Sequence, residues 1–239
     1  MSVLYVVRHG QASFFADDYD QLSPKGVEQS RLLGQHWLEN DVEIDEVYAG
    51  SLARQQQTAD AVGQEYRQAD KSWPDAQVLD GLNEYAADHV MDKLRVELVE
   101  RHEHVRRLSD EFDQSADDRG RYRTFHRLLE ALMRFYIDGE YESDGFETWR
   151  EFHDRVTGAF SHIRSQEGRG RRVAVFTSGG PVGVSVQTTL QAPEQQAGQL
   201  NWRVNNASVT HFTFQSYRIA LDQFNSIAHL PSDDLRTYR

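Results

Sequence analysis

The chain has 239 residues, a formal net charge of −12, no cysteine and an ordinary share of apolar residues. Its length allows one large domain or one domain with an insertion, and its apolar residues suffice for a sizeable core. The lack of cysteine excludes disulfides and thiolate metal sites, and the acidic charge opposes binding to nucleic acid. The N-terminus lacks a basic region, and its apolar run is too short for a signal or a membrane span. We expect a soluble cytoplasmic protein.

The first predicted element is a strand buried on both faces. Residues 3–7 are apolar without alternation, and Arg8, His9 and Gly10 follow them directly. In open α/β sheets, ligands bind just beyond the carboxyl ends of the strands. We therefore expect Arg8 and His9 at a ligand site, where Gly10 lets another group approach the backbone closely.

Helices and short strands alternate in the next part of the chain. The Ser-Pro pair at residues 23–24 predicts the start of a helix that ends near residue 39. A short strand over residues 44–49 leads to Ser51, which is expected to cap the next helix. Arg54 then lies in the first turn of that helix, close to its unpaired amide groups.

Residues from about 86 to 145 are predicted to form a helical insertion, because apolar residues recur there at helical spacing among many charges. The segment 117–120 is expected to end its first long helix, and the segment 138–139 its second. His102 and His104 look like a pair of metal ligands. Because residues two apart do not share a helix face, we expect no metal site there.

The last third of the chain is predicted to contain a helix, a buried strand and two paired strands, over residues 146–163, 173–176, 208–214 and 218–224. The buried strand runs into Ser178, Gly179 and Gly180, which form a loop suited to anions. The alternation of strands and helices predicts a three-layer α/β/α sandwich with a mostly parallel central sheet. We expect a single domain over residues 1–239.

Two arginines and two glycine-containing loops favour binding of a phosphoryl group. Its oxygens could bind Arg8, Arg54 and the loop amides, and a helix dipole would favour its negative charge. Cations beside His9 disfavour the imidazolium, so the ring keeps the lone pair that a nucleophile needs. In-line attack by His9 on phosphorus would give a phosphohistidine.

Departure of an alkoxide requires a proton, and Glu84 lies in a loop after a predicted strand. A carboxyl group beside a bound phosphate is favoured in its protonated form. It can then serve as general acid and afterwards as base for water. Asp80, Asp88 and His89 are close in sequence and are the alternatives for this role.

Taken together, these motifs resemble those of the histidine phosphatase superfamily, the phosphoglycerate mutase-like group. The matching positions are 7–10, 22–23, 26, 29, 51–54, 57–59, 82–84, 179–180, 206–209 and 225–230. The resemblance spans most of the chain outside the insertion. It implies a phosphoglycerate mutase-like fold, with His9 as nucleophile, Arg8 and Arg54 as phosphate ligands and Glu84 as proton donor.

The sequence departs from this family at three points. Ser178 stands where a second histidine usually precedes the paired glycines, so the chain reads Ser-Gly-Gly in place of His-Gly-Gly. Phe14 and Phe15 occupy the stretch where a phosphate-binding asparagine often lies. Glu84 is followed by Tyr-Ala-Ala, whereas cofactor-dependent mutases continue with Arg-Tyr-Gly. The loss of one preorganised donor typically costs about 10²–10³ in rate.

Ser178 has two interpretations: its hydroxyl compensates in part for the missing histidine, or it caps the helix that starts at Pro181. With the first, Gly10, Ser178 and Gly179 join the substrate-binding residues. We predict a phosphomonoesterase that uses no metal or other cofactor and acts on a small phosphorylated substrate. A phospho-ligand binding protein with weak or lost catalysis is the alternative, and a phosphoglycerate mutase is a third.

Overall fold

The structure is a computed structural model that describes residues 1–13, 20–142, 145–215 and 217–238. Phe14 and Phe15 lie outside the described residues. The chain divides into two compact units, Met1–Glu84 with Arg155–Arg239, and Tyr85–Asp154. The prediction of a single domain with an insertion at 86–145 stays a prediction. Within the described ranges, no helix is both long enough and apolar enough to cross a membrane.

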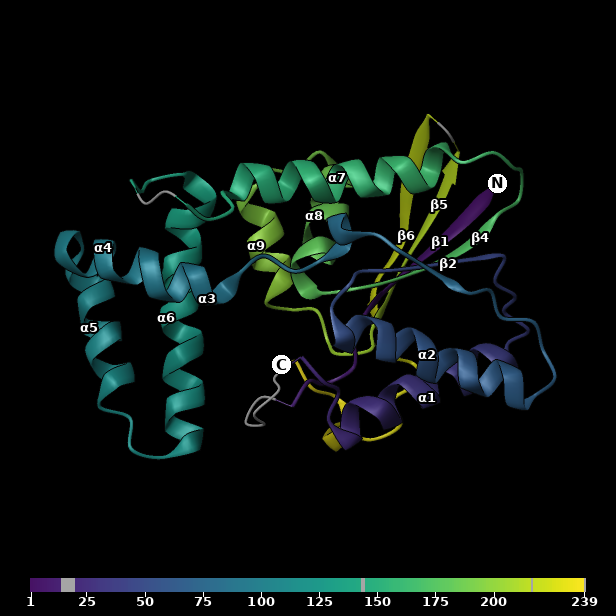
Figure 1. The fold of residues 1–239 in the computed structure, drawn as a ribbon, viewed down its shortest axis with the longest axis horizontal. Helices are drawn as coiled ribbons and strands as arrows, with labels where there is room; N and C mark the ends of the chain where they lie inside the picture. The colour runs from purple at the N-terminus through teal and green to yellow at the C-terminus, as the bar shows by residue number, and fades with distance from the viewer. Residues whose placement is uncertain (14–19, 143–144, 216, 239) are drawn as a thin grey trace. The chain divides into compact units, whose positions relative to one another are not determined.

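The first unit is built on a six-stranded sheet in the order β3-β2-β4-β1-β5-β6 (Figure 1). Its strands are β1 (Ser2–Arg8), β2 (Glu46–Ala49), β3 (Ala76–Val78), β4 (Arg172–Thr177), β5 (Val209–Gln215) and β6 (Arg218–Ser226). Strands β1 to β4 are parallel, whereas β5 and β6 pair antiparallel at one edge. This arrangement confirms the predicted α/β architecture with a mostly parallel sheet.

Helices cover both faces of this sheet. They are α1 (Pro24–Glu39), α2 (Ala53–Gln68), α8 (Gly179–Leu190), α9 (Gln195–Asn201) and, from residue 155 onward, α7 (Trp149–Ser165). Helices α1 and α2 lie on one face, and α7 and α8 lie on the other (Figure 1). Alternate strand residues such as Val7, Val47 and Phe176 pack with Leu33 and Val62 beneath α1 and α2. The strand period of two therefore supplies both faces with apolar side chains.

The parallel strands place their carboxyl ends at one edge of the sheet. Arg8 at the end of β1 is in register with Thr177 at the end of β4, and Ala49 of β2 is in register with Phe176. Residues that follow these strands therefore meet at the same edge, although they are far apart in sequence. This edge is where the predicted site residues gather.

The structure confirms the predicted cap of α1 but not that of α2. Ser23 caps α1 as predicted, because its hydroxyl accepts a hydrogen bond from the Gly26 amide at 3.1 Å. The prediction that Ser51 caps α2 is wrong. That helix begins later, at Ala53, whose amide donates to Asp20 Oδ2 at 2.7 Å. The Ser51 hydroxyl instead accepts a hydrogen bond from the side chain of Asn83.

The second unit is helical, as its sequence pattern predicts. It contains α3 (Ala87–His89), the π-helical turn η2 (Val90–Leu94), α4 (Arg95–Arg101), α5 (Glu103–Asp113) and α6 (Asp118–Asp138), followed by the first residues of α7. The first predicted helix is therefore broken into shorter pieces. Asp117 does not end a helix but begins α6, because its carboxylate accepts the Gly120 amide at 2.7 Å. Gly139 ends α6 in the left-handed conformation, as expected of this residue.

Candidate active site

His9 is the first residue after β1, and its backbone is held from two sides. Its amide donates to the Thr177 carbonyl of β4 at 2.8 Å. Its carbonyl accepts the Ala207 amide at 3.1 Å and the Asn206 side-chain amide at 3.3 Å. The position of the ring is therefore fixed by the sheet and by the segment that leads into β5.

The contacts of the ring assign its tautomer. Nδ1 of His9 lies 2.7 Å from the carbonyl oxygen of Gly10, which can only accept a hydrogen bond. Nδ1 therefore carries the proton, and Nε2 keeps its lone pair. That lone pair accepts a hydrogen bond from Nε of Arg54 at 3.2 Å.

The surroundings keep this ring neutral. His9 is 5% exposed. Burial, followed by the positive charges of Arg54 and Arg8, holds the pKa of His9 well below its usual value. The neutral imidazole with an unprotonated Nε2 is the form that can act as a nucleophile.

Arg54 is oriented by a carboxylate that the sequence pattern did not single out. Its Nη1 lies 2.6 Å from Oδ1 of Asp20, while the other oxygen of Asp20 binds the Ala53 amide at the start of α2. Asp20 thus both begins the helix and holds the arginine on it. Asp20 lies before α1, and no local signal marks its partner Arg54, which is 34 residues away.

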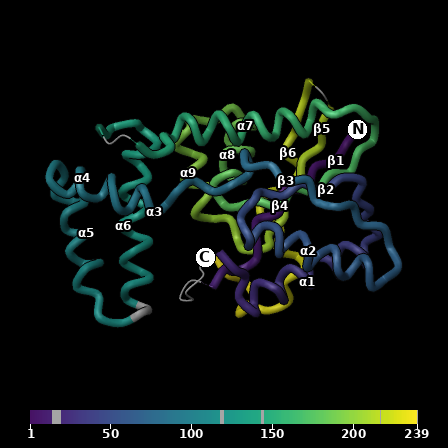
Figure 2. The backbone as a smooth tube through the Cα atoms, in the orientation of Figure 1, coloured from purple at the N-terminus to yellow at the C-terminus, as the bar shows by residue number. Residues whose placement is uncertain are grey.

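Arg8 ends β1, and its guanidinium is held by backbone carbonyls. Its Nη1 donates to the carbonyl oxygens of Val204 and Tyr238. Tyr238 belongs to the C-terminal segment, which returns to α1 (Figure 2). The Gln29 side chain of α1 donates to the Leu235 carbonyl at 2.7 Å. The C-terminal segment therefore contributes to the orientation of Arg8.

Glu84 approaches the loop after β4. Both of its carboxylate oxygens lie 3.1 Å from the Gly180 amide, in the first turn of α8. The Gly180 amide thus donates to the Glu84 side chain at the N-terminus of α8. The structure thus brings Glu84 to Gly180, which is almost 100 residues away in sequence.

Ser178 is fully buried, and its hydroxyl does not cap a helix. Helix α8 begins at Gly179 rather than near Pro181, and the Ser178 side chain makes no capping hydrogen bond. Its oxygen accepts a hydrogen bond from Nε2 of Gln55 at 2.8 Å, and the same amide donates to the Leu82 carbonyl at 3.2 Å. Gln55 shares the buried face of α2 with Thr58 and Val62, so helical spacing could have identified it.

Two glycines of the site are required for packing. A Cβ atom at Gly10 would lie 2.3 Å from the Gly26 carbonyl oxygen, and one at Gly179 would lie 2.2 Å from Oδ1 of Asn201. The Gly10 amide donates to Thr58 Oγ1 at 3.0 Å. Contacts of Gly10 and Gly179 with a substrate stay predictions.

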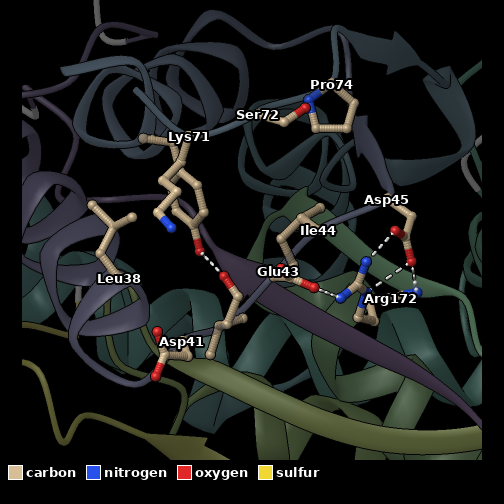
Figure 3. A pocket seen from close by; sticks show the side chains of 11 residues that line it. Leu38, Asp41, Glu43, Ile44, Asp45, Lys71, Ser72, Pro74 and Arg172 are labelled. Atoms are coloured by element: carbon tan, nitrogen blue, oxygen red, sulfur yellow. Dashed lines mark hydrogen bonds and ion pairs between the residues drawn. The ribbon is translucent and has the colours of Figure 1, made fainter. Parts of the chain in front are cut away.

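A separate cavity of about 370 Å³ lies near the amino-terminal ends of β2 and β4 (Figure 3). It is lined by residues that precede β2, by Tyr66 and Lys71, and by Arg172 at the start of β4. Arg172 is held there by Glu43 and Asp45. His9 follows the carboxyl end of β1, so this cavity is not the site of the predicted chemistry. Among the described residues, no group of three or more histidine, aspartate or glutamate side chains is placed to hold a metal ion.

A buried neutral imidazole thus lies beside Arg54 and follows Arg8 directly, at the carboxyl ends of the parallel strands of an α/β sheet. The chain belongs to the histidine phosphatase superfamily (branch 1), whose sequence model matches residues 4–136 and 119–227. No curated protein sequence matches the chain significantly.

Solved structures of similar fold include phosphatases and a mutase. Phosphoserine phosphatase from Entamoeba histolytica, in complex with phosphoserine, is 18% identical with a TM-score of 0.63, over 96% of this chain and 100% of that one. Mycobacterial glucosyl-3-phosphoglycerate phosphatase is 18% identical with a TM-score of 0.63, over 95% of this chain and 100% of that one. Phosphoglycerate mutase from Bacillus anthracis is 18% identical with a TM-score of 0.61, over 95% of this chain and 94% of that one. These similarities confirm the phosphoglycerate mutase-like fold.

Proposed function

We propose that the protein is a phosphomonoesterase that acts through a phosphohistidine on His9. The observation that carries the proposal is the hydrogen-bonding of the His9 ring. Nδ1 donates to the Gly10 carbonyl, and the unprotonated Nε2 faces Arg54. The geometry thus leaves one ring nitrogen with a lone pair beside a cation that can bind a phosphoryl oxygen.

In the first step, the phosphoryl group of the substrate binds between Arg8 and Arg54. Nε of Arg54 keeps its proton but now donates its hydrogen bond to a phosphoryl oxygen instead of to His9, which releases the lone pair of Nε2. Nε2 then attacks phosphorus, the P–Nε2 bond forms, and the bond from phosphorus to the leaving oxygen breaks. Glu84 donates a proton to that oxygen, and the Gly10 carbonyl stabilises the positive charge that develops on the ring.

In the second step, water attacks the phosphohistidine. The Glu84 carboxylate accepts a proton from this water, the P–Nε2 bond breaks, and inorganic phosphate leaves. His9 returns to its neutral form, and Glu84 is protonated for the next turnover. Every group that these two steps require is a side chain or backbone group of the first unit.

Ser178 is proposed as a further phosphate ligand, together with the amides of Gly10 and Gly179. Its oxygen accepts from Gln55, so its own hydrogen is available to a bound anion. Such a hydroxyl replaces in part the donor that a second histidine supplies in the family.

The test is hydrolysis of p-nitrophenyl phosphate and of a panel of alkyl phosphomonoesters. We expect turnover by the wild type, none above background by His9→Asn, and near wild-type turnover by His211→Asn. His211 is a matched control because it is a partly buried histidine of the same unit, in β5, stacked on Tyr5 with ring centroids 5.0 Å apart. Turnover that survives His9→Asn would contradict the proposal.

A second candidate function is a phospho-ligand binding protein with weak or lost catalysis, which the serine at position 178 favours. Calorimetry with inorganic phosphate and phosphomonoesters distinguishes the two. Binding that depends on Arg8 and Arg54 without His9-dependent hydrolysis would support this second candidate. Rapid turnover would eliminate it.

A further inference from the structure

The loop that carries Glu84 is held by a guanidinium from a distant helix. This loop, Asp80–Glu84, follows β3 and has only one short turn of regular structure, η1 (Asp80–Leu82). Nη1 of Arg155 in α7 lies 2.8 Å from the Asn83 carbonyl oxygen, and Nη2 lies 3.1 Å from that of Glu84. Nη1 also lies 3.4 Å from the Asp80 carbonyl and 3.3 Å from the Gly81 carbonyl.

The helix and the loop approach each other closely at Gly81. A Cβ atom at this position would lie 2.8 Å from the Ala159 Cβ and 2.9 Å from the Arg155 carbonyl oxygen. Glycine is therefore needed for the loop carbonyls to come within reach of Arg155.

We propose that Arg155 is the positioning residue for Glu84, an assignment that rests on the proposed role of Glu84 as proton donor. Arg155 binds the Glu84 carbonyl, and the Gly180 amide binds the Glu84 carboxylate. Glu84 is thus fixed at both its main chain and its side-chain end. Neither contact places Arg155 on the substrate, so it acts through Glu84.

The shape of the guanidinium matters for this role. Its donors spread in one plane and reach several carbonyls at once, whereas a lysine ammonium is a compact point charge. Arg155→Lys keeps the positive charge but loses the fork. We therefore expect this variant to fold and to let the loop shift, which weakens proton donation by Glu84.

The test compares two substrates that differ in their need for a general acid. Benzyl phosphate releases a strongly basic alkoxide, whereas p-nitrophenyl phosphate releases a stable phenolate. Because general acid catalysis contributes about 10²–10⁴-fold, we expect Arg155→Lys to lower kcat/KM for benzyl phosphate by about tenfold or more. The value for p-nitrophenyl phosphate is expected to stay within about threefold, since its leaving group needs little proton donation.

Two further variants make the result specific. Glu84→Gln is expected to lower the ratio of kcat/KM for benzyl phosphate to kcat/KM for p-nitrophenyl phosphate, and to lower it more than Arg155→Lys does. When Arg155→Lys is added to Glu84→Gln, we expect no further change in this ratio. Arg171→Lys is the matched control, because Arg171 also binds backbone and carboxylate groups of this unit, at Ile163 and Glu46. It should leave the ratio unchanged.

Equal losses on both substrates, or no change in the ratio, would overturn the assignment of Arg155. If Arg155→Lys does not fold, Gly81→Ala provides the same test, because its methyl group pushes the loop away from α7. An unchanged ratio in Gly81→Ala then overturns the assignment. Absence of His9-dependent turnover in the wild type would overturn the proposed function instead, and the role of Arg155 with it.

Discussion

Two buried neutral histidines are expected to make the fold sensitive to mild acid. Burial and the charges of Arg54 and Arg8 hold the pKa of His9 well below its usual value. Burial and the neighbouring His36 lower the pKa of His229 to about 4. In the unfolded chain both rings titrate near 6.5. As the pH falls below about 6.5, the unfolded chain therefore binds more protons than the folded protein. The free energy of unfolding that the neutral histidines contribute is fully present above this pH and is lost progressively below it.

The size of the effect follows from proton linkage. Each histidine that is neutral in the fold and protonated in the unfolded chain lowers the free energy of unfolding by about 1.4 kcal/mol per pH unit. For His229 the window runs from 6.5 down to about 4, so its total contribution is roughly 3.4 kcal/mol. Together, His9 and His229 are expected to give a slope of about 2.7 kcal/mol per pH unit within the window they share.

Urea unfolding at several pH values between about 6 and 5, where the unfolded rings are largely protonated, measures this slope. We expect His9→Asn and His229→Asn each to reduce it by about one proton, or about 1.4 kcal/mol per pH unit. The carboxylates contribute equally to all three proteins, so the differences isolate the histidines. If His9→Asn retains the full wild-type slope, His9 is not held neutral in the fold and the argument for its free lone pair fails.

Further variants probe the site and the packing of the first unit. Arg54→Lys loses the planar donor beside His9, so kcat/KM is expected to fall by about 10²–10³, and a change below about threefold would refute its role as a phosphate ligand. Ser178→His alone is expected to lower the urea midpoint, because Ser178 is fully buried against Gln55. Adding Gln55→Ala should recover stability and raise turnover, and a double variant no better than the single one would contradict this. Gly183→Ala is expected to cost about 1–3 kcal/mol, because its Cβ would lie 2.4 Å from the Ala197 carbonyl oxygen. Gly158→Ala in α7 meets no atom within 4 Å and should stabilise by about 0.5–1 kcal/mol, so equal effects of the two substitutions would refute the packing argument.

Much of the framework could be predicted from local patterns. The unbroken apolar run of β1 marks a buried strand by composition alone. The Ser23 cap of α1 and Gly139 at the end of α6 are local signals, because the interaction that explains each lies within a few residues. The parallel strands then bring His9 and the loop at Ser178 to one edge, which follows from topology alone.

The parts that sequence reasoning missed depend on partners distant in the chain. The start of α2 is set by Asp20 rather than by the adjacent Ser51. Arg171 directly precedes β4 and is buried against Glu46, which is 125 residues away in the chain. No local pattern reveals such pairings, and the contacts of Gln55 and Arg155 belong to the same class.

The most direct test of the account is the identification of the phosphorylated nitrogen. The protein is mixed with a phosphomonoester, quenched in base to preserve phosphohistidine, and examined by mass spectrometry and by ³¹P and ¹⁵N NMR. Because Nδ1 is bound to the Gly10 carbonyl, we expect phosphate on Nε2 of His9 and nowhere else. Phosphate on Nδ1 of His9, on another residue, or on no residue during active turnover would contradict the proposed mechanism.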